Sequence, residues 1–477
     1  MKSALYVAAI AAMASVPALA QVPVVPAQGS GTPTLDGQLP GPHGFFRCAT
    51  PGTDATTQNS FAPPSDCSAN NTNPDPAYSP ANLDVVEIQV VFHVIRTNNG
   101  GGNVPNSRVL SQIDILNEDF RALTATPGSN GTDSKIQFAL ATVDPNGQAT
   151  TGIIRYDNTT WYNDSGSYWN SIAWDPDVYM NVYTMGAPGG SNNILGYVPF
   201  LPASSPGSVG NNNDRVVVLN SAVGRNAPIS TYNQGRTLTH EVGHYLGLNH
   251  TFNGGCGGGN CYTSGDRICD TNAESQPEYN CPGNSSSCGS QDPVRNYMNY
   301  SPDTCMQLFT EEQSRRMRCT LEFYRPAIAA PVGPTGPVLG ENYCVLTPNS
   351  TGSAAIITGF GTKQVSANNV VLLASSLPPN SFGFFIVGNN QVQIPNPGGS
   401  DGTLCVAGDT GRFLGQLGSS GPFGELVLTV DNTALPQSAG GPIAIQAGET
   451  WNFQAWYRDA NPTISSNFTN GYTITFE

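Results

Sequence analysis

Apolar and polar positions along the first half of the chain form a pattern that predicts a sheet with a helix packed on it. Asp84–Arg96 is an almost continuous apolar, β-branched run, which is typical of a buried strand. In Asn106–Leu123 the main apolar residues recur four, three and four positions apart, which predicts a helix with one face on the sheet. Further strands are predicted at Lys135–Ala141, Val178–Thr184 and Arg215–Leu219. A helix and strands in this order indicate an α/β sheet.

The pattern changes in the last third of the chain. Thr310 and Gln313 form a capping-box pattern, which predicts a helix that ends near Phe323. Ala329–Gly340 is rich in proline and glycine and is predicted to be a linker. Residues 341–477 contain short apolar runs between Gly, Pro and Asn turns, which predicts an all-β sandwich domain. Examples of these runs are Val370–Leu373, Gly383–Val387, Leu426–Val430 and Tyr472–Phe476.

The N-terminus has the pattern of a secretory signal. Lys2 is followed by the apolar run Ala4–Val16 and by Ala18-Leu19-Ala20, which is an A-x-A cleavage pattern. We therefore predict a signal peptide at residues 1–20 and a secreted, soluble protein. The alternative is a retained N-terminal anchor, for which the apolar run is short. Residues 21–83 have little apolar periodicity and are predicted to be a flexible leader or pro-segment.

Charge and cysteine content narrow the choice of partners and compartment. The net charge is −15 with only three lysines, so neither nucleic acid nor an anionic membrane surface is an expected partner. Eleven cysteines in an exported chain argue for disulfides, and the odd number leaves at least one thiol unpaired. Cys344 and Cys405 are alone in the C-terminal region and are expected to pair with each other. We expect a monomer.

The strongest chemical pattern is H-E-x-x-H-x-x-G-x-x-H, formed by residues 240–250. On a helix, His240 and His244 lie one turn apart on the same face, so both imidazoles can reach one metal. Glu241 is placed beside them to hold a water, and Gly247 allows the chain to turn and bring in His250 as a third ligand. Three neutral nitrogens and one open water position describe a catalytic zinc site. The alternative is an ordinary core helix with satisfied histidines.

The stretches His240–Phe252, Gly265–Glu274 and Asn296–Thr310 together resemble the pappalysin-type metzincins, a family of zinc metalloproteases. The resemblance extends over about residues 84–325. It implies an α+β or α/β catalytic domain at residues 84–328, with a mixed sheet, an active-site helix and a methionine turn. It also implies a secreted zinc endopeptidase whose substrates are extracellular proteins or peptides.

The resemblance implies roles for two residues that follow the zinc motif, Met298 and Tyr300. Met298 is expected to lie in the methionine turn beneath the histidines, where a thioether packs as a hydrophobic floor; by itself it would be a plain core residue. The Tyr300 hydroxyl is expected to face the developing oxyanion, and the alternative is a half-buried aromatic with its hydroxyl at the surface. The chain departs from its relatives at Asn272, where they often have proline, and at Asn299, where they often have aspartate. Neither residue is a metal ligand.

The resemblance also implies a calcium site and a set of disulfides. Hard oxygen ligands suit calcium, and the alternative is a solvated acidic loop braced by disulfides. The residues expected to hold calcium are Asp266, Asp270, Thr271 and Glu274. The implied disulfides are Cys256–Cys288 and Cys281–Cys305, with Cys261–Cys269 as a plausible further pair. Cys319 then remains with the two cysteines of the leader, Cys48 and Cys67.

Cys48 lies in a stretch, R-C-A-T, that resembles the R-C-G-T of pappalysin-type zymogens, with alanine in place of glycine. A thiolate in the fourth zinc position would displace the catalytic water and make the full chain latent. In this hypothesis Cys67 pairs with Cys319 and tethers the leader. The alternative is a Cys48–Cys67 disulfide that pins a short loop.

Relatives prefer a basic residue just after the scissile bond, read by an acidic group shortly after the methionine turn. Asp303 is in that neighbourhood, although the register is open, and the alternative is an aspartate that caps a turn after Pro302. Substrate is expected to pair, extended, with an edge segment near Gly196–Pro199.

The function predicted is peptide-bond hydrolysis with Glu241 as general base. Proteins of two other classes are compatible with the sequence: an adhesion or matrix protein with a degenerate zinc domain, and a binding protein whose main activity resides in the C-terminal β-domain. That domain is expected either to bind a surface or polysaccharide or to serve stability or export.

Overall fold

The computed structural model describes residues 40–51, 65–148, 150–331, 339–460 and 464–477. The predicted signal peptide at residues 1–20 and much of the predicted leader lie outside these ranges. In the part of the chain that is described, no helix is both long enough and apolar enough to span a membrane.

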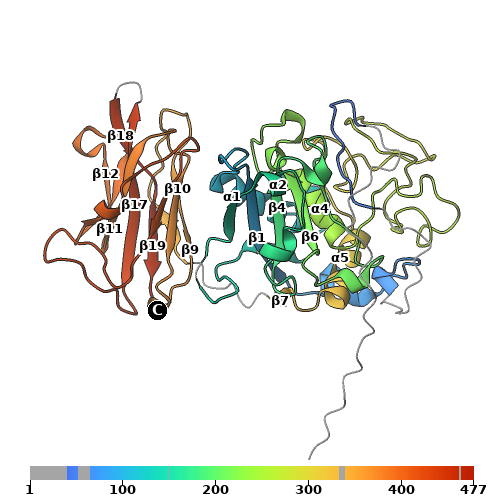
Figure 1. The fold of residues 1–477 in the computed structure, drawn as a ribbon, viewed down its shortest axis with the longest axis horizontal. Coiled ribbons are helices and arrows are strands. Elements are labelled where there is room, and N and C mark those ends of the chain that lie inside the picture. The colour runs from blue at the N-terminus through green and yellow to red at the C-terminus, as the bar shows by residue number, and fades with distance from the viewer. Residues whose placement is uncertain (1–39, 52–64, 149, 332–338, 461–463) are drawn as a thin grey trace, which may run out of the picture. The chain divides into compact units, whose positions relative to one another are not determined.

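A seven-stranded mixed sheet forms the first part of the fold (Figure 1). Its main path runs β2-β1-β4-β6-β5, and β3 and β7 also pair with β1. The β5–β6 and β1–β7 pairs are antiparallel and the other pairs are parallel. The strands are β1 (Val86–Arg96), β2 (Ile136–Leu140), β3 (Ile153–Asp157), β4 (Met180–Met185), β5 (Gly196–Tyr197), β6 (Arg215–Leu219) and β7 (Ala329–Pro331). The mixed sheet predicted from the sequence is therefore present.

The helices cover this sheet and share its core. Val109 and Leu116 of one helix and Leu238 and Val242 of another are buried together with the apolar residues of the strands. Burial on both faces explains why the central strands are apolar at nearly every position. The helices are α1 (Asn106–Phe120), α2 (Thr159–Tyr162), α3 (Trp169–Ile172), α4 (Arg236–Tyr245) and α5 (Glu311–Tyr324). The predicted capping box is confirmed, because Thr310 and Gln313 exchange hydrogen bonds at the start of α5.

Three short elements differ from what the pattern predicts. β3 has only two consecutive apolar residues and β5 has only two residues, so neither shows the apolar alternation by which strands are recognised. β7 lies in the predicted linker: Ala329–Pro331 pairs with β1 before the proline- and glycine-rich stretch, most of which lies outside the described residues.

Residues 65–83, which the sequence places in the leader, form three 3-10 turns that contact α5: Ser65–Cys67, Pro76–Tyr78 and Pro80–Asn82. Cys67 in the first turn is disulfide-bonded to Cys319 of α5. The pairing corresponds to the tether of the latency hypothesis and replaces the alternative Cys48–Cys67 bond.

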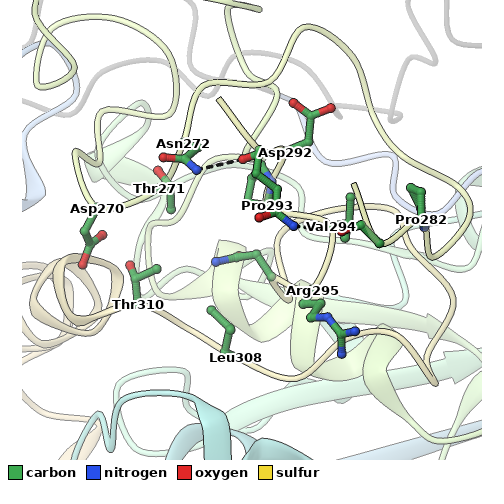
Figure 2. Close-up of a pocket in the computed structure, with 13 residues that line it drawn as sticks. Asp270, Thr271, Asn272, Pro282, Asp292, Pro293, Val294, Arg295, Leu308 and Thr310 are labelled. Atoms are coloured by element: carbon green, nitrogen blue, oxygen red, sulfur yellow. Dashed lines mark hydrogen bonds between the residues drawn. The ribbon is translucent and has the colours of Figure 1, made fainter. Parts of the chain in front are cut away.

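The loops between α4 and α5 are held by three disulfides, Cys256–Cys288, Cys261–Cys269 and Cys281–Cys305. These loops carry a pocket that is lined by Asp270, Thr271, Asn272, Asp292, Arg295 and Thr310 among others (Figure 2).

Among the described residues after 338, every pair of strands is antiparallel. A three-stranded and a seven-stranded sheet contribute residues such as Leu372 and Phe453 to one apolar core. Cys344 and Cys405 are joined by a disulfide. The strands are β8 (Glu341–Tyr343), β9 (Ile356–Phe360), β10 (Val371–Ser375), β11 (Phe382–Gly388), β12 (Asn390–Pro395), β13 (Thr403–Ala407), β14 (Gly411–Arg412), β15 (Gly418–Ser419), β16 (Leu426–Thr429), β17 (Thr450–Ala460), β18 (Ile464–Phe468) and β19 (Gly471–Thr475).

Candidate active site

Two histidines of the motif lie one turn apart on α4, which is buried along its whole length. The Nδ1–H of His240 donates to the carbonyl of Tyr297 at 2.7 Å, and that of His244 donates to the carbonyl of Leu248 at 2.7 Å. These bonds fix the tautomer in which each Nε2 carries a lone pair that faces the site. Burial lowers the pKa of both imidazoles, to about 4 for His244, so both are neutral.

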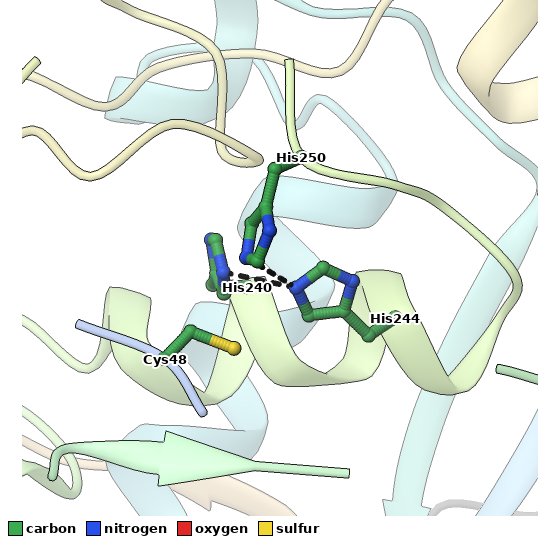
Figure 3. Close-up of side chains that lie close together, drawn as sticks. All are labelled: Cys48, His240, His244 and His250. Atoms are coloured by element: carbon green, nitrogen blue, oxygen red, sulfur yellow. Dashed lines mark hydrogen bonds between the residues drawn. The ribbon is translucent and has the colours of Figure 1, made fainter. Parts of the chain in front are cut away.

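His250 reaches the same point because the chain turns sharply at Gly247. Gly247 has a φ of +90°, which disfavours any residue with a side chain, and a Cβ at this position would meet Thr320 of α5. The His250 Nε2 lies 2.9 Å from the Nε2 of His244, which is itself 3.1 Å from the Nε2 of His240 (Figure 3). Burial also lowers the pKa of His250.

Cys48 completes the cluster. Its Sγ and one nitrogen of each of the three histidines all lie within 4.8 Å of one another, and all four residues are buried. Within the described residues, this is the one group of three or more His, Cys, Asp or Glu side chains that meets such a spacing. Three neutral imidazole nitrogens and a thiol that converge in a buried space match the donor set of zinc.

Met298 and Tyr300 both lie close to the histidine cluster. A Cβ at position 243 would collide with the Sδ of Met298, so the glycine in the motif lets the methionine approach the helix directly beneath the histidines. Tyr300 is fully buried, and its hydroxyl donates to the carbonyl of Cys48 at 3.3 Å. Its ring packs edge-on against His250 with a centroid distance of 5.0 Å. The alternative of a surface hydroxyl does not apply in this structure.

Asp119 of α1 supports the site through hydrogen bonds to residues around the histidines, a role that the sequence pattern does not indicate. Its carboxylate accepts hydrogen bonds from the Tyr297 hydroxyl at 2.7 Å, Thr239 Oγ1 at 2.7 Å and Arg236 Nη2 at 3.1 Å. The Tyr297 carbonyl accepts the hydrogen bond that orients the His240 ring. Asp119 bonds to the side chain of Tyr297 and therefore helps to fix that orientation. Burial raises the pKa of Asp119 to about 6, although the Arg236 charge opposes the rise.

Residues 40–51, which we call the arm, lie beside the edge of the mixed sheet. Phe46 donates its amide to the Asn193 carbonyl at 2.8 Å and accepts from the Leu195 amide at 3.0 Å. Ala49 donates to the Gly196 carbonyl at 3.0 Å. The bridge between Phe46 and Ile194 is parallel, so the arm and this edge segment run in the same direction.

The arm also contacts the general-base candidate. Glu241 is buried, and its Oε2 accepts from the Cys48 thiol at 3.3 Å and from Thr50 Oγ1 at 3.1 Å. Burial raises the pKa of Glu241 to about 8. Burial, followed by the Glu241 charge, raises the pKa of the Cys48 thiol well above its ordinary value. Cys48 is the one free cysteine among the described residues.

Arg47 fills a neighbouring buried site. Its guanidinium pairs with Asp303 at 2.8 Å, with both side chains fully buried, and lies 4.8 Å from the centroid of the Tyr232 ring. The other Asp303 oxygen accepts from the backbone amides of Gln234 and Arg236 at the start of α4. Asp303 therefore binds a basic side chain of the arm and accepts hydrogen bonds from backbone amides at the start of α4.

The candidate calcium residues are not gathered at one point by their hydrogen bonds. Asp266 accepts from Thr271 at 2.7 Å and is buried, whereas Asp270 is exposed and accepts from the first turn of α5. Both oxygens of Glu274 accept from the amide of Asn299, at 3.0 and 2.9 Å. Of these residues Asp270 and Thr271 line the pocket in Figure 2, whereas Asp266 and Glu274 do not. The asparagine at 299 thus gives Glu274 a neutral donor where relatives often have a second carboxylate.

Comparison with known proteins agrees with the geometry. The model of the peptidase M43 family, described as pregnancy-associated plasma protein-A, matches residues 163–322. An extracellular metalloprotease of Colletotrichum graminicola is 35% identical over 247 residues, which cover 50% of this chain and 78% of that protein. Extracellular metalloprotease 1 of Coccidioides posadasii is 33% identical over 244 residues, which cover 49% of this chain and 75% of that protein. The solved structure of mature Tannerella forsythia mirolysin with a cleaved peptide is 32% identical and covers 52% of this chain and 100% of that chain, with a TM-score of 0.44.

The buried histidine cluster and the named relatives define a metalloprotease. More narrowly, the chain belongs to the peptidase M43, or pappalysin, family. About half of the chain lies outside the alignments with these relatives.

Proposed function

We propose that this protein is a secreted zinc endopeptidase in which His240, His244 and His250 hold the metal and Glu241 is the general base. The observation that carries the proposal is the convergence of three buried, neutral imidazoles next to a buried glutamate. Zinc, when bound there, lowers the pKa of a water and polarises the scissile carbonyl.

The side chains around this point have complementary roles. Glu241 takes the proton from the attacking water and delivers it to the leaving amine. Tyr300 donates to a backbone carbonyl in the present arrangement, and we infer that it donates to the oxyanion of the tetrahedral intermediate in the same way.

We infer that the arm is an inhibitory pro-segment. It places a thiol at the histidines, a hydroxyl on Glu241 and an arginine on Asp303, so three parts of the site are covered by Arg47–Thr50. A divalent cation at the histidines favours the thiolate, which is the form that ligates. Because Arg47 precedes Cys48, the basic side chain lies on the N-terminal side of the residue at the metal. In a substrate with a basic residue after its scissile bond, that residue lies on the C-terminal side of the carbonyl at the metal. We therefore infer that the arm and a substrate lie in the active site with opposite N-to-C directions.

The chelator dependence of protein digestion tests the proposed function. Chain from which residues 40–51 have been removed should digest casein, lose more than about 90% of that activity with a zinc chelator, and regain it with added zinc. A binding or adhesion protein would show no digestion under any of these conditions. The parent chain treated in parallel serves as the control.

Asp303 is expected to set a preference for Arg or Lys after the scissile bond. Asp303→Asn keeps an oxygen for the α4 amides but removes the charge, so cleavage before basic residues should fall about tenfold or more relative to cleavage before neutral ones. A peptide-library profile measures the ratio, which a general loss of folded protein does not alter. An unchanged ratio would remove the assignment.

Calcium binding near Asp266 stays a prediction, with a pH dependence. Burial raises the pKa of Asp266 to about 7, so without calcium its contribution favours the folded state at acidic pH and is lost as pH rises through 7. Calcium binds the charged carboxylate, so it should raise the thermal midpoint of chelator-stripped, zinc-restored protein by about 5 °C at pH 8 and by less at pH 5. Asp266→Asn should abolish the gain. A thermal midpoint that does not change on addition of calcium at either pH would refute the calcium site.

We further propose that residues 341–477 form a separate β-sandwich domain that binds a surface or polysaccharide. Phe384 and Trp456, partly exposed on neighbouring strands with ring centroids 5.1 Å apart, support an aromatic contact surface.

A further inference from the structure

Residues 65–83, which we call the strap, are joined to the rest of the chain by a disulfide and by buried contacts. Cys67 is 1% exposed and joined to Cys319 of α5. Asp66 is buried and lies 3.5 Å from Arg315 of the same helix. The Thr72 amide donates to the carbonyl of Tyr262 at 2.9 Å.

Arg316 of α5 joins the strap to the zinc motif. It is 1% exposed, and its Nε donates to the carbonyl of Gly247 at 2.7 Å. Its Nη1 donates to the Asp66 carbonyl and to Thr72 Oγ1, each at 3.2 Å, and its Nη2 donates to the Ser68 carbonyl at 3.0 Å. All four acceptors are neutral oxygens, and three of them belong to the strap.

A buried guanidinium is stable only when its donors are satisfied. Without the strap, the Nη1 and Nη2 groups of Arg316 would lose the three acceptors described above. The guanidinium would then have unsatisfied donors and would reorient towards solvent, which would break its hydrogen bond to Gly247. Gly247 is the turn between His244 and His250, and its other face rests on Thr320 of the same helix. The position of the third histidine is thus coupled to the strap through one side chain.

We propose that the strap is a permanent part of the mature enzyme and that Arg316 is a positioning residue, which uses the strap to hold the Gly247 turn and thereby His250. The removable pro-segment then ends before Cys67, rather than at residue 83 as the sequence pattern suggests. This inference rests on the zinc site proposed above.

Zinc retention tests the role of Arg316. The parent is the full chain with Cys48→Ala and Glu241→Gln, so that only the histidines hold zinc and no self-digestion occurs. Arg316→Lys in this parent should weaken zinc retention against a competing chelator about tenfold or more. Arg318→Lys is the matched control, because Arg318 is also buried on α5 and donates to backbone carbonyls, of Asp84 and Lys135, outside the strap and the zinc motif. The control should lower the thermal midpoint to a similar extent while zinc retention stays at the parental level.

A strap variant tests whether the effect passes through the strap. Thr72→Val removes one Arg316 acceptor at constant shape and should weaken zinc retention severalfold, with a smaller effect when Arg316 is already lysine. Additive effects, or equal retention in the Arg316 and Arg318 variants, would overturn the inference alone. A parent that binds no zinc would overturn the proposed function as well.

The N-terminus of the naturally processed enzyme gives an independent check. Mass spectrometry of the reduced protein should place it between Cys48 and Cys67, with the strap on the same polypeptide as α5. A fully active, zinc-retaining enzyme that begins after residue 83 and lacks the strap would overturn the inference.

Discussion

Glu241→Gln is expected to lower the turnover of an arm-free enzyme about a hundred- to ten-thousandfold while zinc stays bound. Glutamine keeps the shape of the side chain but cannot take a proton from water or return one to the leaving amine. The three histidines proposed to hold the metal are not among the observed partners of this carboxylate, which are Cys48 and Thr50. The measurements are kcat on a peptide substrate and zinc content per chain.

The matched control for this variant is Glu118→Gln. Glu118 is also largely buried, with 16% of its side chain exposed, and pairs with Arg225 away from the histidines. It should leave kcat within about twofold of the parent. Substantial turnover in the Glu241 variant would remove the general-base assignment, whereas loss of zinc from that variant would point to a structural role.

Cys48→Ala is expected to make the uncut full chain active, with a gain on the order of a hundredfold, which corresponds to about 2.7 kcal/mol. The substitution removes the one thiol in the histidine cluster and the hydrogen bond from the thiol to Glu241. Activity should appear in freshly purified chain whose mass shows no cleavage, and self-digestion should follow. The parent chain should be silent until cut.

Arg47→Ala is the informative companion, because it removes the ion pair with Asp303 but keeps the thiol. It should give only partial activity. If the uncut Cys48 variant were as silent as the parent, the thiol would not be the source of latency. If the Arg47 variant alone were fully active, the arm would be held by its charge rather than by its sulfur.

The histidine cluster and the helix that carries two of its members could be predicted because the information is local. A spacing of four places two histidines on one helical face, and a glycine three residues later permits the turn that brings in the next. The capping box at the start of α5 and the long apolar strand β1 could also be predicted from the sequence, since each depends on residues that are close together in the chain.

The supports of the site were hidden for the opposite reason. In the sequence, Asp119 and Arg316 each look like an ordinary charged residue on a helix surface. Their roles follow from contacts that are distant in sequence: Asp119 bonds to Tyr297, 178 positions away, and Arg316 bonds to Gly247, 69 positions away. Residues 65–83 have no apolar period because a disulfide and side-chain hydrogen bonds, rather than a packed face, fix them. Arg47 and Thr50 flank Cys48, so their closeness to the site could be predicted from the R-C-A-T stretch. Their partners, Asp303 and Glu241, could not be predicted.

The arm and the strap lie on opposite sides of any cut between residues 51 and 65, and the strap is joined to α5 by the Cys67–Cys319 disulfide, whereas the arm's Cys48 is a free thiol. While the chain is intact, the arm faces its site at an effective concentration in the millimolar range. After the cut it becomes a free peptide that must rebind from solution, and a secreted enzyme is dilute enough that the peptide diffuses away. If the arm is the inhibitory pro-segment proposed above, contacts that suffice for inhibition within one molecule would then be too weak between two molecules, and a single hydrolysed bond would make activation irreversible.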